Sequence, residues 1–320
     1  MLERPPVFTN DLLDLHYLID RFGFIFITEG YYHPPKIVRS RLTYFPDPFG
    51  KIYIQGKSYS KFYGSNRNLK KIVPVEYVNN SSPDGSGCFV PIKNIYQILD
   101  PRLGLKENPH LETIITSLTD IGINCQGNIG VIGSYLLRAN NDDSDIDIVI
   151  YGKENAKILL SNYKNLKLKH SWTCPTNDDI QRRAIKYKKN YNLTIKENLL
   201  LNSIRKRSRL DFRLPNGKII GFHCVYLPEE IPPNPIKSNQ HKDDEIEFTG
   251  KILSDIESCF MPRVYLVHHN QNNKKYSVIT YMWRFWVAAD QGDNVLVRGK
   301  LIDDYTILLS DHIHGVYPIL

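Results

Sequence analysis

Two aspartates, Asp145 and Asp147, alternate with isoleucines in the stretch DIDIVI. β-Branched residues favour a strand, and successive side chains of a strand point to opposite faces. The two carboxylates are therefore predicted to share one face, with Ile146 and Ile148 on the other. Neighbouring carboxylates repel and raise each other's pKa unless a cation lies between them. The pair thus predicts a site for a divalent metal ion.

A third aspartate, Asp211, lies in the stretch RLDFRL. The Pro-Asn-Gly turn at 215–217 joins this stretch to KIIGFHCVYL, and such a short Gly-containing connection predicts a β-hairpin. Strand alternation places Asp211 and Arg213 on the face opposite the leucines and phenylalanine of RLDFRL. An ion pair with Arg209 or Arg213 is the alternative to a metal-binding role for Asp211.

Gly133 and Ser134 complete a pattern with the three aspartates. Gly-Ser, about ten mostly polar residues, Asp-x-Asp on a strand and a third carboxylate on another strand resemble the DNA polymerase beta type nucleotidyltransferase superfamily, over roughly residues 110–228. The hairpin around Asp211 is similar to the one on which the family's polymerases carry their third aspartate. The stretch TEGYYHPPKIVRSRLTYFPD also resembles a segment of uncharacterised archaeal proteins that carry this domain.

The resemblance implies a metal-dependent enzyme that moves NMP from an NTP, with ATP the expected donor, to a hydroxyl and releases pyrophosphate. Asp145, Asp147 and Asp211 would hold two Mg²⁺ or Mn²⁺ ions, which bridge the phosphates and activate the attacking hydroxyl. Gly133 would let the backbone approach a phosphate, and Ser134 would offer its hydroxyl and N–H at a helix N-terminus.

The basic excess of the chain is concentrated in residues 181–213, which hold eleven Lys or Arg against Glu197 and Asp211, a net charge of +9. The rest of the chain has 30 basic and 32 acidic residues, a net charge of −2. Such a cluster indicates a phosphate-rich partner, RNA or DNA, although a solvated helix face is an equal alternative. The candidate nucleic-acid contacts are Arg182, Arg183, Lys186, Lys188, Lys189, Arg205, Lys206 and Arg207.

Pattern and composition divide the chain into three parts of an α+β protein. Residues 1–105 read as a β-rich N-terminal domain, and 106–240 as the catalytic core, a mixed sheet with flanking helices that start near Pro109 and Lys153. A Pro-rich and charged linker at 227–245 leads to short strands at 241–320, the spacing of a small β-barrel. The barrel is either of the oligonucleotide-binding (OB) type or a barrel that serves only packing or dimer contacts. Tyr281, Trp283 and Phe285 would share one strand face of this barrel, to stack bases or to form its core.

The remaining composition argues against several other classes of protein. The chain has no apolar run long enough for a membrane span and no signal-peptide pattern at its start, so we expect a cytoplasmic protein without a membrane partner. The five cysteines are widely spaced without a C-x-x-C motif, which indicates free thiols rather than disulfides or a zinc site. The histidines, His223 among them, are assigned to packing or to the surface.

Two alternatives to a nucleic-acid-modifying enzyme stay open. The nucleotidyltransferase core could be a non-catalytic scaffold on a nucleic-acid-binding protein, or the enzyme could adenylylate a protein or a small molecule. A scaffold gains nothing from keeping three like charges together, which favours the enzyme. The sequence leaves the oligomeric state and the use of a template open.

Overall fold

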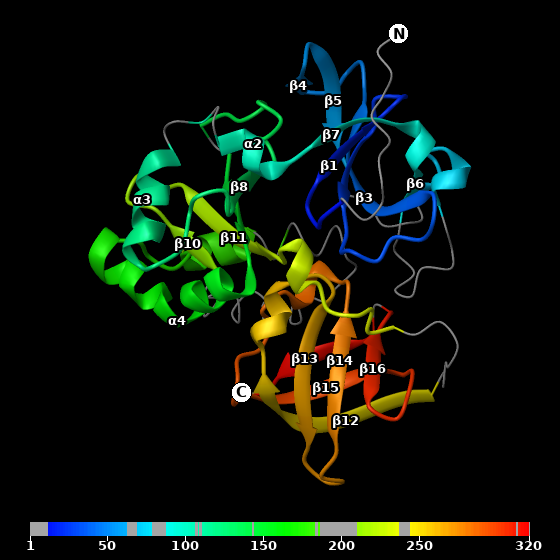
Figure 1. Cartoon of the computed structure of the whole chain (residues 1–320), viewed down its shortest axis with the longest axis vertical. Helices are drawn as coiled ribbons and strands as arrows, with labels where there is room; N and C mark the ends of the chain where they lie inside the picture. Colours follow the sequence, from blue (N-terminus) through cyan, green and yellow to red (C-terminus); the bar gives the residue numbers. More distant parts are fainter. Residues whose placement is uncertain are drawn as a thin grey trace.

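The chain forms three β-structures, which Figure 1 shows as an N-terminal sheet in blue, a central sheet in green and a barrel in orange and red. This computed structural model describes residues 12–62, 69–78, 88–105, 108, 111–142, 144–182, 185, 210–236, 244–311 and 313–319. None of the helices within these ranges has the length and apolar content that a membrane crossing needs.

The N-terminal sheet confirms the β-rich character expected of the first third of the chain. Its order is β4-β5-β3-β2-β1-β7, with β6 also paired to β3, and its neighbours run antiparallel. Short connections between consecutive strands are compatible only with such antiparallel pairing. The strands are β1 (Tyr17–Asp20), β2 (Ile25–Thr28), β3 (Ile37–Pro46), β4 (Ile52–Ile54), β5 (Lys57–Lys61), β6 (Cys88–Pro91) and β7 (Ile95–Leu99).

The central sheet is mixed, as predicted for the catalytic core. Its order is β10-β11-β9-β8, in which β9 and β11 are parallel and the other pairs are antiparallel. The predicted hairpin is confirmed, because β10 pairs antiparallel with β11 across the turn at 214–218. The strands are β8 (Ile129–Ile132), β9 (Ile146–Tyr151), β10 (Asp211–Arg213) and β11 (Ile219–Val225).

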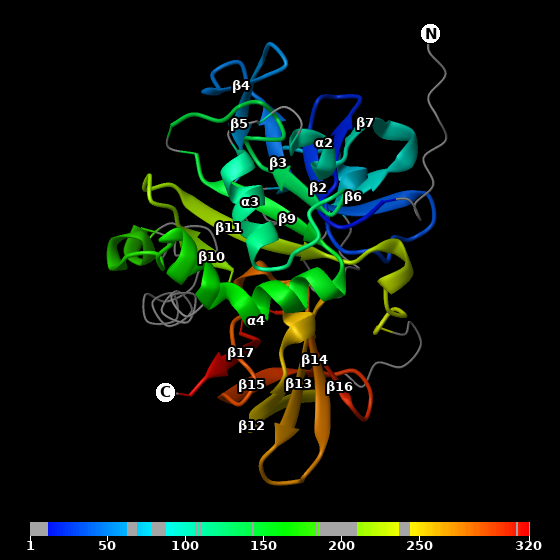
Figure 2. The same cartoon turned by 60° about the vertical axis from the view of Figure 1, so that its left-hand side comes forward.

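The helices α2 (Pro101–Leu105), α3 (Glu112–Asp120) and α4 (Lys153–His170) accompany the central sheet, and residues 177–182 are also helical. The helix predicted near Pro109 is confirmed as α3, which buries Ile114 and Leu118. The helix predicted near Lys153 is confirmed as α4, which supplies part of the crossover that parallel strands require between β9 and the hairpin and which buries Leu159 and Leu160. Figure 2 shows α4 lying across the central sheet, on the side of the barrel.

The predicted barrel is confirmed as a closed structure of five strands. The order β12-β13-β14-β16-β15 closes through an additional β12–β15 pairing, and β14 and β16 are its parallel pair. Inward side chains alternate with outward ones, as in β13, where every second residue is buried. The strands are β12 (Asp244–Ser254), β13 (Arg263–His269), β14 (Lys275–Thr280), β15 (Asn294–Leu301) and β16 (Thr306–Leu309), and β17 (Gly315–Pro318) adds to β15.

The aromatic stripe predicted on one barrel strand is wrong. β14 ends at Thr280, and Trp283–Phe285 forms a 3-10 turn, so the side chains do not alternate as they would on a strand. Tyr281 and Phe285 are buried in the apolar core, and Trp283 is only partly buried, at the junction of the barrel with the other two sheets. Tyr281 and Phe285 are therefore unable to stack on bases.

The barrel packs directly on the central sheet. The ring of Tyr226, which follows β11, stacks on Phe260 with centroids 3.9 Å apart, and Lys153 Nζ lies 2.7 Å from Glu257 Oε1. Trp286 and Phe260 belong to the same apolar core as the central strands and part of the N-terminal sheet. The predicted linker is also engaged, because the Glu230 carboxylate accepts hydrogen bonds from the Lys153 N–H at the start of α4.

Candidate active site

The strand register of the central sheet aligns two of the predicted aspartates. Asp211 on β10 lies opposite Gly221 on β11, and Gly221 lies opposite Asp147 on β9. A Cβ atom on Gly221 would stand 3.3 Å from Asp147 Oδ1 and 3.4 Å from Asp211 Oδ1. The two carboxylates thus face each other across a position that carries no side chain.

Asp145 lies one residue before β9, and its side chain is exposed. The predicted alternation holds, since Ile146 and Ile148 are buried and Asp147 is partly exposed between them. Asp147, Gly221 and Asp211 thus form a row across three strands. The structure brings Asp147 and Asp211 together in this row and leaves Asp145 exposed to solvent.

Gly133 closes the other side of Asp147. It has a φ of +69°, a conformation that favours glycine, and a Cβ there would lie 3.3 Å from Asp147 Oδ2. The Gly133 N–H donates to the Tyr17 hydroxyl of the N-terminal sheet at 3.1 Å. Burial, together with the nearby Tyr44 and Asp147, raises the pKa of Tyr17 well above its usual range, which keeps this hydroxyl neutral.

The helix N-terminus implied at Gly133 and Ser134 is not observed. Residues 133–138 form a turn, in which Leu137 N–H donates to the Gly133 carbonyl and Ala139 N–H to the Ser134 carbonyl. The Gly133 N–H is committed to Tyr17, so Ser134 is the residue of the pair that can offer a backbone donor to a phosphate.

The donor set suits a hard divalent cation. Mg²⁺ and Mn²⁺ take carboxylate oxygens, and the carboxylates of Asp147 and Asp211 flank the side-chain-free position at Gly221. Among the described residues, no three His, Cys, Asp or Glu side chains are already grouped closely enough to hold a metal ion. The arrangement therefore provides two carboxylates for a cation, with Asp145 as the candidate for the third.

His223, which the sequence analysis assigned to packing or to the surface, lies in this site. Its Nε2 is 3.4 Å from Asp147 Oδ1, and its ring stacks on Trp286 of the barrel with centroids 4.8 Å apart. The signal for it was strand alternation, because His223 is two residues after Gly221 and so shares its face of β11. That signal becomes readable only when β11 is known to lie beside β9.

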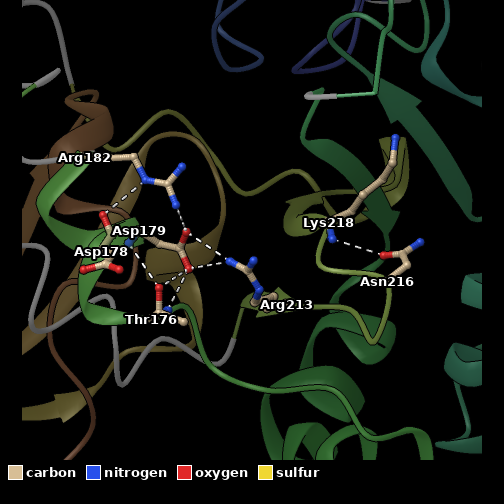
Figure 3. Close-up of polar contacts among 7 residues, drawn as sticks. All are labelled: Thr176, Asp178, Asp179, Arg182, Arg213, Asn216 and Lys218. Carbon is tan, nitrogen blue, oxygen red and sulfur yellow. Dashed lines mark hydrogen bonds and ion pairs between the residues drawn. The ribbon is translucent and has the colours of Figure 1, made fainter.

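Asp179 was also missed, and Figure 3 shows it between two arginines. Arg213 Nη1 lies 3.0 Å from Asp179 Oδ2, and Arg182 Nη2 lies 3.0 Å from Asp179 Oδ1. Burial opposes the charge of Asp179, but hydrogen bonds from Thr176 and Arg213 hold the pKa of this carboxyl below its usual range. Arg213, which the sequence offered as an ion-pair partner of Asp211, is thus engaged by Asp179.

Arg182 is the only candidate nucleic-acid contact within the described ranges. Its side chain is largely exposed and is tethered to Asp179 at the start of the basic segment. The other candidates lie outside the described residues: Arg183, Lys186, Lys188, Lys189, Arg205, Lys206 and Arg207.

A side chain added at Gly221 tests whether the row Asp147–Gly221–Asp211 binds a metal ion. A Gly221→Ala substitution adds a methyl group in tight contact with both, and we expect it to weaken Mn²⁺ binding, measured by calorimetry, about tenfold. Ala is compatible with a strand, so the melting temperature should change little. Gly127→Ala is the control: it lies in open space but at positive φ, so it should affect stability and not Mn²⁺ binding. Unchanged Mn²⁺ affinity in Gly221→Ala would show that the ion binds elsewhere.

Comparison with known proteins finds a family match that covers part of this site. Residues 111–209 match the family model described as a nucleotidyltransferase domain, which covers Gly133, Ser134, Asp145 and Asp147 and ends just before Asp211. The chain is 27% identical over 189 residues to the uncharacterized protein MJ1086 of Methanocaldococcus jannaschii. That alignment covers 58% of this chain and 53% of the relative, so the chain spans about half of the relative's length. No solved structure matches the chain.

Proposed function

Because residues 111–209 are a nucleotidyltransferase domain of the polymerase beta superfamily, we propose that the protein transfers NMP from an NTP, with ATP the expected donor, to a hydroxyl on a nucleic acid and releases pyrophosphate. The observation that carries the proposal is the row Asp147–Gly221–Asp211, with Gly133 at its side. This row supports the proposal because it holds two carboxylates side by side, one of them, Asp147, within the matched residues and the other, Asp211, just beyond them.

In this proposal Asp147 and Asp211 would hold Mg²⁺ or Mn²⁺, with Asp145 as a further ligand. The metal would neutralise phosphate charge and lower the pKa of the attacking hydroxyl. Asp211, nearly completely buried beside Gly221, polarises the acceptor hydroxyl. Ser134 offers its hydroxyl and N–H to the terminal phosphates, and Tyr17 fixes the turn that presents it by accepting from Gly133.

A nucleic-acid acceptor is supported by the net charge of +9 in residues 181–213, which connect two strands of the site. The barrel supports it as well, because its strand order with one parallel pair is compatible with an OB-like fold. In this view an N-terminal domain (1–105), a catalytic core (106–240) and the barrel (241–320) contribute together, and the barrel extends the acceptor surface.

The proposal is tested by incubating the protein with each labelled NTP and Mg²⁺ or Mn²⁺, in parallel with an RNA oligonucleotide, a DNA oligonucleotide and no added acceptor. Label on an oligonucleotide supports the proposed function. Label on the protein itself would assign it to protein adenylylation instead. Absence of any labelled product, with tight oligonucleotide binding retained, would indicate a non-catalytic scaffold.

The basic segment, residues 181–213, should give salt-dependent binding to single-stranded nucleic acid. Each phosphate contact releases counterions, so we expect the logarithm of the binding constant to fall with the logarithm of salt by about 0.7 per phosphate. Charge reversal at Lys188 and Lys189 should flatten this slope, measured by fluorescence anisotropy. Reversal of the exposed Lys274 and Lys275 on the barrel hairpin is the matched control. Binding without salt dependence would refute a role for the basic segment.

A further inference from the structure

The imidazole of His223 lies between the candidate metal site and the barrel. One edge faces Asp147, with Nε2 3.4 Å from Oδ1, and the ring is stacked on Trp286 at an interplanar angle of 11°. A second ring of the barrel region, Trp283, makes a T-shaped contact with it at a centroid distance of 5.5 Å. The His223 side chain is only 12% exposed, so these neighbours leave its ring little freedom.

The two tryptophans are themselves fixed. Trp286 is buried, and its backbone N–H donates to the backbone carbonyl of Trp283 in the 3-10 turn. Trp283 Nε1 donates to Glu29 Oε1 of the N-terminal sheet at 3.3 Å, and the Arg41 guanidinium lies 4.4 Å from the Trp283 ring centroid. The position of the His223 ring is therefore determined jointly by all three β-structures.

A hydrogen bond from His223 restricts the Asp147 carboxylate, whose terminal torsion is intrinsically broad and whose side chain is 40% exposed. An ionised carboxylate only accepts hydrogen bonds, so His223 donates to it in the tautomer that carries a proton on Nε2. A donor held in a stacked ring fixes the direction of Oδ1, which is also the oxygen that faces Gly221 and Asp211. Partners that orient a metal-binding carboxylate in this way set its affinity for the ion.

We infer that His223 is a positioning residue that orients the Asp147 carboxylate for the metal, and that the barrel holds His223 in place through Trp286. The inference rests on the proposed function, since it assigns Asp147 to the metal. It gives the barrel a second role besides acceptor binding, because a shift of Trp286 changes the direction of a carboxylate in the site.

The test compares variants that separate the hydrogen bond from the packing. His223→Phe keeps a flat ring against Trp286 but cannot donate, whereas His223→Gln restores a donor near the Nε2 position. Mn²⁺ binding in the absence of nucleotide, measured by electron paramagnetic resonance, reports the carboxylate geometry without turnover. We expect His223→Phe to weaken Mn²⁺ binding about 10-fold to 100-fold, and His223→Gln to recover most of this loss.

Melting temperatures accompany each variant, and Trp286→Phe, which reduces the stacked area, should give a smaller loss of Mn²⁺ affinity than His223→Phe. His268→Phe on the barrel is the matched control, because His268 bonds Asn273 far along the chain from the site. Equal Mn²⁺ affinity in the wild type and His223→Phe overturns the inference alone, as does His223→Gln binding as weakly as His223→Phe. A wild-type protein that binds no Mn²⁺ overturns the metal-dependent function and this inference together.

Discussion

Replacing Asp147 with Asn is expected to lower nucleotidyl transfer more than about 100-fold, the upper end of what is lost when only an outer partner of a metal ligand is removed. The amide conserves the shape of the side chain and removes the charge that would bind the cation. Asp147 is partly exposed at the face of the sheet, so the melting temperature should stay close to that of the wild type. Transfer is measured with labelled NTP at saturating Mg²⁺.

Substitutions of Asp145 and Asp211 test the separate roles of these two aspartates in the same assay. Asp145→Asn should also lower transfer and Mn²⁺ affinity, whereas Asp211→Asn should abolish transfer and leave NTP binding largely intact. Asp178→Asn is the control, because Asp178 is an exposed aspartate beside the Asp179 cluster and outside the row. Normal turnover in both Asp145→Asn and Asp147→Asn would remove them from the metal site, and normal turnover in Asp211→Asn would exclude Asp211 from the site.

Removal of residues 244–320 should destabilise the rest of the chain and abolish NTP binding. If the Pro-rich stretch at 227–245 were only a linker, as its composition predicts, the truncated chain would instead keep a metal site that still binds NTP. In the structure the barrel covers Tyr226 with Phe260 and His223 with Trp286. Truncation exposes this part of the apolar core and releases the histidine beside Asp147.

A single substitution tests how much the contact between the barrel and the central sheet contributes to stability. Phe260→Ala should lower the free energy of unfolding by about 3–5 kcal/mol, the range for emptying a large buried aromatic site, as measured by urea denaturation. Tyr305→Ala, at an exposed aromatic of the barrel, should change it by less than about 0.5 kcal/mol. A protein of residues 1–243 that melts like the full chain and binds NTP would contradict the role given to the junction.

Local sequence pattern was sufficient for the elements and for part of the site. The β-branched residues that alternate with aspartates identified β9 and the strand face on which Asp147 lies. The turn at 215–217 identified the β10–β11 hairpin that carries Asp211. The order of Gly133, the aspartate pair and Asp211 indicated the nucleotidyltransferase family. These features depend on interactions between near neighbours in the chain, which sequence periodicity records.

Only the tertiary structure decided which distant residues meet. The parallel register of β9 with β11 places Gly221 between the two carboxylates and His223 beside Asp147, a pairing across 76 residues that no local pattern encodes. The pairing of Arg213 with Asp179 likewise joins residues that are 34 positions apart. The stacking of Trp286 on His223 depends on how the barrel packs against the central sheet. The hydrophobic effect has no preferred direction. The apolar residues of the sequence therefore determined that these surfaces would be buried, and only the tertiary fold determined which residues cover them.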